Sequence, residues 1–213
     1  MSQQNTQIKN QAESQTGLRS DLHIIQNWVA DKSQVLDLGC GQGDLLAYLK
    51  TQKQCKGYGL EIHEDSIVSC VEKGLNVIEH NLNDGLAHFK DDAMDTVIMT
   101  QALQAVSRPD LLLDDMLRVG KEAIITFPNF GYWRTRFYLL TKGKMPMSKT
   151  LPFNWYDTPN IHMCTFRDFE KLCREKNLTI LNRTVVDKNH QKSLSTSLFP
   201  NLLGEIAVYR VTK

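Results

Sequence analysis

The chain of 213 residues lacks any apolar run long enough to cross a bilayer, and its first residues lack the apolar core of a signal peptide. Cysteine is scarce as well, because the sequence has five and no two of them form a C-x-x-C pair. These absences argue against a disulfide framework and against a zinc site, so no bound metal is expected. We expect a cytoplasmic protein that does not bind a membrane.

Excess charge of one sign is also missing. The 25 lysine and arginine residues balance 24 acidic residues and leave a net charge of +1. Whole-chain charge therefore does not indicate nucleic-acid binding, and any basic character has to be local. Apolar residues are scarce at the start, where residues 1–17 are rich in Gln, Asn and Ser and predict a disordered tail. We expect residues 18–213 to form one domain.

The most informative feature that is present is a glycine triplet, Gly39, Gly41 and Gly43. The apolar run at residues 35–38 predicts a buried strand before it, and the leucines of residues 45–49 recur at helical spacing after it. Glycine allows positive φ and removes the Cβ atoms that would keep a ligand off the backbone. Because the first N–H groups of the helix point at the same place, the pattern predicts a nucleotide-binding loop.

The glycine spacing and one acid separate this loop from the dinucleotide fingerprint, which is written G-x-G-x-x-G. Here the spacing is G-x-G-x-G, and Asp37 precedes the first glycine by two positions, where it suits a cationic amino group better than a phosphate. Glu61 ends the second expected strand about 20 residues further on, where such folds bind the ribose hydroxyls. Together these residues resemble the S-adenosylmethionine site of class I methyltransferases. The alternative is a tight strand-to-helix turn without a ligand.

Strands alternate with helices after this loop, which predicts a sheet covered by helices on both faces. We expect an α/β, doubly wound, mostly parallel sheet of seven strands, with an antiparallel closing strand. The last two strands, near residues 180–186 and 205–211, look like an antiparallel pair. The other expected strands are residues 35–38, 58–61, 77–78, 95–99 and 123–127, and the expected helices include residues 22–29, 66–73 and 110–119.

Polar side chains follow two of the expected strands. Asn81 comes just after the third strand, where its side chain could reach an adenine, and Gln101 follows the fourth strand on the floor of the crevice. Ligands of such sheets bind at the carboxyl ends of the strands. The alternatives are a turn-forming Asn81 and a Gln101 that starts a helix. The candidate cofactor residues are Asp37, Gly39, Cys40, Gly41, Gly43, Glu61, Ile62, Asn81, Leu82 and Gln101.

Residues 130–164 interrupt the alternation, and acids are absent from residues 130–156, which hold eight aromatic residues and five cations. We expect this insertion to form a cap over the ligand crevice. The aromatic residues could form a satellite core, which is the commonest outcome. The cations could instead face an anionic substrate or an acidic patch of a partner protein. Stacking on single-stranded nucleic acid ranks last, because the cations are few.

Several blocks of the sequence carry a more specific resemblance. They are LRSDL (18–22), VLDLGCG (35–41), ALQAV (102–106), FPNFGYWR (127–134), KMP (144–146) and WYDTPNIH (155–162). With these blocks the chain resembles, from about Leu18 to about Leu181, the MetW family of bacterial methionine-biosynthesis proteins. The resemblance implies a class I methyltransferase-like fold, a site for S-adenosylmethionine or S-adenosylhomocysteine, and a role beside homoserine O-acyltransferase. Asn81 departs from the family pattern, in which an acid is usual.

A methyltransferase would also need to activate its acceptor, by a positioned base or by holding a nucleophile in line. His162 and Tyr156 in the expected cap are the nearest candidates, yet a lone loop histidine is more often structural, and neither is assigned a catalytic role. Two hypotheses remain. The protein is a binding and regulatory subunit whose cap docks onto the acyltransferase, or it is a methyltransferase that acts on a small anionic acceptor beneath the cap.

Overall fold

The computed structural model describes residues 20–148, 150–186 and 198–213, so the tail predicted at residues 1–17 lies outside the described residues. One sheet of seven strands has the order β3-β2-β1-β4-β5-β7-β6. The strands are β1 (Gln34–Leu38), β2 (Lys56–Glu61), β3 (Val77–Glu79), β4 (Met94–Thr100), β5 (Gly120–Pro128), β6 (Thr179–Val186) and β7 (Ile206–Thr212).

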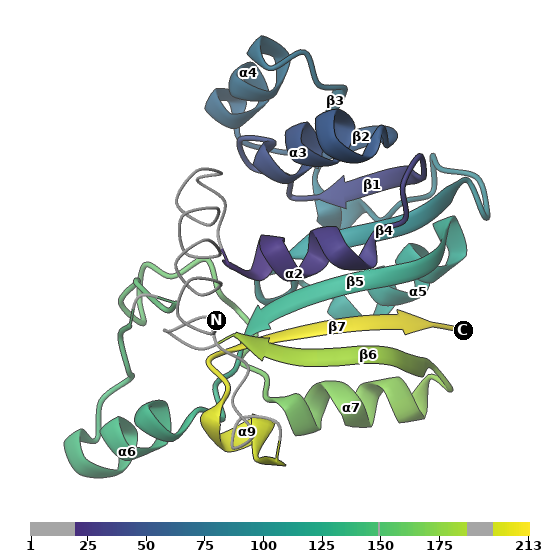
Figure 1. Cartoon of the computed structure of the whole chain (residues 1–213). Coiled ribbons are helices and arrows are strands. Elements are labelled where there is room, and N and C mark those ends of the chain that lie inside the picture. The colour runs from purple at the N-terminus through teal and green to yellow at the C-terminus, as the bar shows by residue number, and fades with distance from the viewer. Residues whose placement is uncertain (1–19, 149, 187–197) are drawn as a thin grey trace, which may run out of the picture.

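Helices cover both faces of this sheet (Figure 1). Two separate clusters of buried apolar side chains lie between the helices and the strands, one with α5 and α7 and the other with α2, α3 and α4. The helices are α2 (Ser20–Trp28), α3 (Asp44–Lys53), α4 (Glu64–Glu72), α5 (Pro109–Val119), α6 (Trp133–Lys142), α7 (Phe166–Glu175) and α9 (Pro200–Leu203), and two 3-10 turns are η1 (Leu82–Asp84) and η2 (Leu103–Ala105).

Strand directions agree with the sequence prediction. Strands β1 to β5 run parallel to one another, whereas β7 runs antiparallel to both β5 and β6. The central strand β4 is buried along most of its length, as a strand covered on both faces requires. The prediction of a mostly parallel sheet with an antiparallel closing strand is confirmed.

Helix boundaries follow local signals in the sequence. Pro109 occupies the first turn of α5, where its missing N–H is harmless, and the helix ends where β5 begins at Gly120. A capping box starts α7, because Thr165 accepts from the Asp168 N–H and the Asp168 carboxylate accepts from the Thr165 N–H. The box has a local sequence signal, a threonine followed three positions later by an acid.

An aromatic cluster joins α7 to the end of β5. The ring of Phe169 lies 5.2 Å from that of Phe127 and 4.7 Å from that of Tyr209 in β7, measured between ring centroids. All three side chains are at most 2% exposed. The cluster therefore fixes the point at which the chain leaves the sheet and enters the insertion at residues 130–164.

Helix α6 within that insertion was not predicted. Two ordinary helix signals mark it nevertheless. Residues 133–142 contain no glycine or proline, and Gly143 ends the helix with a left-handed φ of 59°. Figure 1 shows α6 at the lower left, standing apart from the sheet. Thr135 is its one buried residue among ten. The helix therefore presents most of its surface to solvent.

Within the described ranges, every helix is too short or too polar to traverse a bilayer.

Replacing Phe169 by Ala should destabilise the protein by about 3–5 kcal/mol, because the substitution removes a buried ring and leaves a cavity. The matched control is Phe153→Ala, at a side chain that is 45% exposed. This control should change the free energy of unfolding by less than about 0.5 kcal/mol. Urea denaturation followed by circular dichroism measures both, and equal midpoints for the two variants would contradict the role given to the cluster.

Candidate functional site

The glycine triplet forms the turn between β1 and α3, with positive φ at every glycine. The φ angles are 69° at Gly39, 54° at Gly41 and 78° at Gly43. Side chains with a Cβ atom rarely adopt such angles, so the turn depends on glycine at these positions. Gly43 is also the N-cap residue of α3.

The three glycines have different surroundings. A Cβ atom built on Gly41 meets no heavy atom of the described residues within 4 Å, whereas one on Gly43 lies 2.5 Å from the Leu75 side chain and 2.8 Å from Cys70 Sγ. Gly43 therefore allows α3 to pack closely against the α4 region. Gly41 is the glycine that borders open space, which a ligand approaching the backbone requires.

Glu61 ties the glycine loop to the end of β2. Its side chain is 6% exposed, and its carboxylate accepts hydrogen bonds from the backbone N–H groups of Gly41 at 2.8 Å, Ile62 at 2.8 Å and His63 at 3.0 Å. Several N–H donors stabilise the charged form of a buried carboxylate. The sequence indicated a ribose ligand at this position but gave no sign of this structural role.

A second buried carboxylate, Asp37, makes the loop electrostatically negative. Asp37 is 1% exposed and lies between Gly59 of β2 and Ile98 of β4 in the sheet register. Burial, and after it the charge of Asp37, raises the pKa of the Cys40 thiol well above its usual range. The field that opposes a thiolate at Cys40 favours a cation in the same place.

Leu82 and Ala102, which follow β3 and β4, lie beside Gly39 of this loop. A Cβ atom built on Gly39 would lie 3.3 Å from the Ala102 Cβ and 4.0 Å from a Leu82 methyl carbon. The structure thus brings together residues that follow β1, β3 and β4. Ala102 was not among the candidates, although it follows Gln101 directly.

Asn81 is exposed, and its side-chain oxygen accepts from the Asn83 N–H at 3.0 Å. This bond caps η1, so Asn81 acts as the turn former that was the alternative to an adenine contact. The two roles are compatible, because an amide oxygen has a second lone pair.

Gln101 has a strained backbone, with a φ of 52° that is uncommon for a residue other than glycine. Its N–H donates to the backbone and side-chain oxygens of Thr126, both at 3.0 Å, and its side-chain amide donates to Asp21 at 3.1 Å. Asp21 is 2% exposed and lies in α2. Strain of this kind gathers at functional sites. The sequence placed Asp21 in a MetW-like block but assigned it no role.

The return segment of the insertion crosses the carboxyl end of β4. The backbone N–H groups of Ile161 and His162 both donate to the Gln104 carbonyl in η2, at 2.8 and 3.0 Å. A ring nitrogen of His162 lies 3.1 Å from the Ser107 carbonyl, while Tyr156 is 71% exposed. These contacts favour the structural interpretation of His162.

The satellite core considered for the insertion is not what the structure shows. Six of the eight aromatic side chains of residues 130–156 are exposed: Trp133, Phe137, Tyr138, Phe153, Trp155 and Tyr156.

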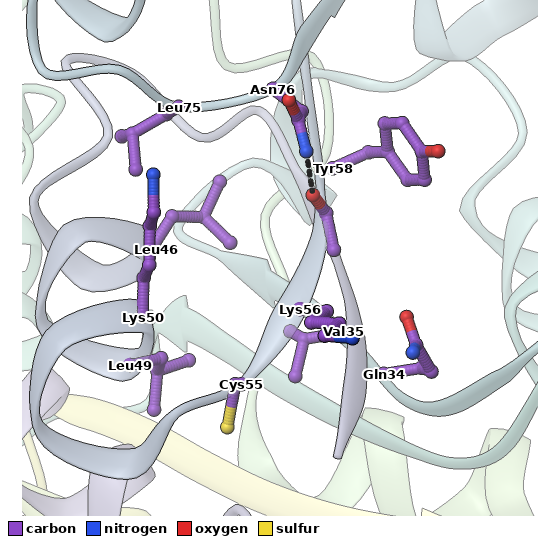
Figure 2. A pocket seen from close by; sticks show the side chains of 11 residues that line it. Gln34, Val35, Leu46, Leu49, Lys50, Cys55, Lys56, Tyr58, Leu75 and Asn76 are labelled. Carbon is purple, nitrogen blue, oxygen red and sulfur yellow. Dashed lines mark hydrogen bonds between the residues drawn. The ribbon is translucent and has the colours of Figure 1, made fainter. Parts of the chain in front are cut away.

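A cavity of about 280 Å³ lies away from the glycine loop, at the amino ends of β1 and β2 (Figure 2). Leu46 and Leu49 line it together with Lys50, and on its wall the Asn76 amide donates to the Gly57 carbonyl at 3.3 Å. None of its lining residues is a candidate cofactor residue. Across the described ranges, no group of three or more His, Cys, Asp or Glu residues is placed to hold a metal ion.

Comparison with known proteins gives one family. A family model described as methionine biosynthesis protein MetW matches residues 19–211. The chain is also 35% identical over 200 residues to the bifunctional methionine biosynthesis protein MetXA/MetW of Rhodopirellula baltica. That match covers 90% of this chain but 32% of the relative, so the chain spans about a third of the relative's length.

Solved structures share the fold at low sequence identity. An S-adenosylmethionine-dependent methyltransferase from Mesorhizobium loti has a TM-score of 0.68 at 13% identity, over 93% of this chain and 100% of the other. The [4+2]-cyclase SpnF has a TM-score of 0.62 at 17% identity, over 91% of this chain and 80% of the other. One neighbour is named as a methyltransferase and the other as a cyclase. The shared fold therefore does not determine the reaction.

The different surroundings of Gly41 and Gly43 predict different stabilities for their alanine variants. Gly41→Ala should cost about 1–2 kcal/mol, which is the penalty of a left-handed backbone at a residue with a Cβ atom. Gly43→Ala adds a steric clash with Leu75 and Cys70, and overpacking of this kind costs about 1–3 kcal/mol more. Urea denaturation gives both values. Equal destabilisation would show that the packing at Gly43 is not as described.

Proposed function

Because the chain belongs to the MetW family, we propose that it binds S-adenosylmethionine or S-adenosylhomocysteine at the glycine loop and acts together with homoserine O-acyltransferase. The single observation that carries the cofactor part is the open space beside Gly41, next to a buried acceptor, Glu61. A nucleoside can approach the backbone at Gly41, where no side chain intervenes, and its ribose hydroxyls can donate to the Glu61 carboxylate.

The candidate side chains contribute to this binding in different ways. Glu61 supplies acceptor oxygens for the ribose hydroxyls, and Asp37 supplies negative charge for the amino group of the ligand. Ile62 is 52% exposed and offers an apolar surface for the adenine, together with the half-buried Leu82. Asn81 remains a candidate for the adenine edge. The complete proposed set is Asp37, Gly39, Cys40, Gly41, Gly43, Glu61, Ile62, Asn81, Leu82 and Gln101.

When bound, S-adenosylmethionine supplies a methyl group on a cationic sulfur, and the residues of this chain bind it and orient it. The negative charges of the two buried carboxylates, Asp37 and Glu61, favour that cation. Methyl transfer to a small anionic acceptor is the alternative. It is not preferred, because neither candidate for activating an acceptor is placed as a base: a ring nitrogen of His162 lies 3.1 Å from the Ser107 carbonyl, and Tyr156 is 71% exposed.

The relative from Rhodopirellula baltica supports the partner, because its name joins MetXA and MetW in one bifunctional protein. Two units that are joined in one chain meet at a high effective concentration without a strong interface. Where the partner is a separate chain, association needs a surface that attracts it.

We propose that α6 provides this surface. Trp133, Phe137 and Leu140 follow each other at intervals of four and three residues, so they lie on one side of the helix, and we call them the docking face. They are 42%, 60% and 83% exposed. A contiguous exposed apolar surface of this kind typically marks a protein interface.

A cation beside the docking face suits an acidic partner. Arg134 is exposed, its guanidinium carbon lies 5.4 Å from the centre of the Trp133 ring, and residues 130–156 contain no acid. Positive charge at the rim of an interface accelerates association with a negative surface. Arg136 belongs elsewhere, because its guanidinium donates to the Gly131 carbonyl and supports the turn that precedes α6.

Binding of S-adenosylmethionine should weaken about ten- to a hundred-fold in Glu61→Ala, because charge-assisted hydrogen bonds contribute about 1.5–3 kcal/mol. Gly41→Val should abolish binding, since its side chain fills the open space. The matched control is Glu64→Ala, at an exposed acid in α4. Calorimetry measures the affinities, and circular dichroism confirms folding. Undiminished affinity in both site variants would refute the cofactor proposal.

Leu140→Glu should weaken binding to the acyltransferase about tenfold or more, because it places a charge on the docking face at its most exposed apolar residue. The matched control is Leu111→Glu, at a leucine of α5 that is 52% exposed. Co-purification and calorimetry with the acyltransferase from the same organism, with and without S-adenosylmethionine, give the affinities. Glu61→Ala should still dock but lose any response to the cofactor. Equal binding by Leu140→Glu and Leu111→Glu would remove α6 from the interface.

A further inference from the structure

A second cavity, of about 230 Å³, lies beneath α6 and shares no lining residue with the candidate cofactor site. It is lined by Pro128 at the end of β5, by the following Asn129, by residues of α6, and by residues 146–148, 150 and 151. Tyr132 and Tyr138 contribute aromatic rings, and Glu205 lines the same cavity. The cavity is large enough for a small molecule.

Glu205 is a buried carboxylate with little to neutralise it. The residue is 7% exposed, and the hydroxyl of Thr150 donates to its Oε1 at a long 3.4 Å. Its Oε2 has no hydrogen-bond or ion-pair partner in the part of the chain that the structure describes. A buried carboxylate without a cation is unfavourable. The position therefore suits a cationic ligand group that can enter the cavity.

The backbone holds Glu205 in this position from both sides. Its N–H donates to the Val186 carbonyl at 3.3 Å, and its carbonyl accepts from the Asn129 N–H at 2.8 Å. The Asn129 side chain in turn donates to the Gly204 carbonyl at 2.8 Å and accepts from the Gly131 N–H at 2.9 Å. The carboxylate is thus fixed by the junction of β5 and β7, as a preorganised binding group requires.

Arg134 brings the opposite charge to the same cavity. It is exposed, and its guanidinium carbon lies 5.4 Å from the centre of the Trp133 ring. Arg134 and Glu205 both line the cavity, yet they form no ion pair with each other. Two opposite charges that stay apart across a small cavity can bind the two ends of a zwitterion.

We propose that this cavity binds a small α-amino acid with an uncharged side chain, whose ammonium group bonds to Glu205 and whose carboxylate bonds to Arg134. Pro146 and Leu151 supply apolar walls for the side chain. A ligand with a charged side chain would lose hydration without gaining a partner there. The inference does not depend on cofactor binding, because the two sites share no residue.

The test begins with calorimetry of the purified chain against L-norvaline and L-methionine. Each ligand fragment is tested separately with butylamine, which keeps the ammonium group of norvaline, and with pentanoate, which keeps its carboxylate. Both amino acids should bind, and both fragments and L-glutamate should bind about tenfold more weakly or worse. No binding of either amino acid up to about 10 mM would overturn the proposal, and so would butylamine that binds as tightly as norvaline.

Variants then locate the site. Glu205→Gln and Arg134→Gln should each weaken norvaline binding about tenfold or more. The matched controls, Glu79→Gln and Arg167→Gln, change exposed residues outside the cavity and should bind as the wild type does. Wild-type affinity in Arg134→Gln or in a folded Glu205→Gln would overturn the assignment.

Thermal unfolding reports whether Glu205→Gln is folded, and Arg134→Gln, at an exposed residue, provides the test independently of that outcome. A parallel titration of both variants with S-adenosylmethionine should match the wild type. Failure of the amino-acid site is therefore distinguishable from failure of the cofactor site.

Discussion

The carboxylate of Glu61 is the interaction on which the candidate site depends. It accepts from the Gly41 N–H and from the first two N–H groups after β2, so one buried charge holds the glycine loop against the neighbouring strand. The N–H groups of Gly39 and Cys40 add to this link, since both donate to the Leu60 carbonyl at 2.8 and 3.1 Å. A ligand that bonds to Glu61 therefore meets an acceptor already fixed by the fold, and loses little free energy in ordering it.

Features that depend on a few consecutive residues, or on the alternation of strands and helices, could be predicted from the sequence. The apolar run of β1, the glycine triplet and the capping box of α7 each occupy a few consecutive residues, and the alternation of strands and helices predicted the sheet. Contacts between distant residues could not be predicted. The bond from Gln101 to Asp21 spans 80 positions, and the strained φ of Gln101 leaves no mark in composition. Glu205 was the first residue of an expected strand and no local pattern marked it, because its burial depends on residues that are distant in the sequence, at the end of β5 and at residues 146–148.

The sheet and the insertion differ in what they say about function. The fold of the sheet is shared with proteins of different named activities, so it says little about the reaction. The insertion is more particular: six of the eight aromatic residues of residues 130–156 are exposed, that stretch contains no acid, and it lines a cavity together with the buried carboxylate of Glu205. Both proposed roles outside the cofactor site, the docking of a partner and the binding of an amino acid, therefore use α6.

The exposed stripe of α6 also has a consequence for the protein in solution. The docking face exposes the apolar side chains of Trp133, Phe137 and Leu140 to water, and exposed apolar surfaces promote self-association when no partner covers them. If the proposed partner covers this surface, a cell that makes this chain in excess of that partner would risk aggregation. Balanced synthesis of the two proteins would remove that risk, and a bifunctional polypeptide such as the MetXA/MetW relative of Rhodopirellula baltica would supply both parts in every copy.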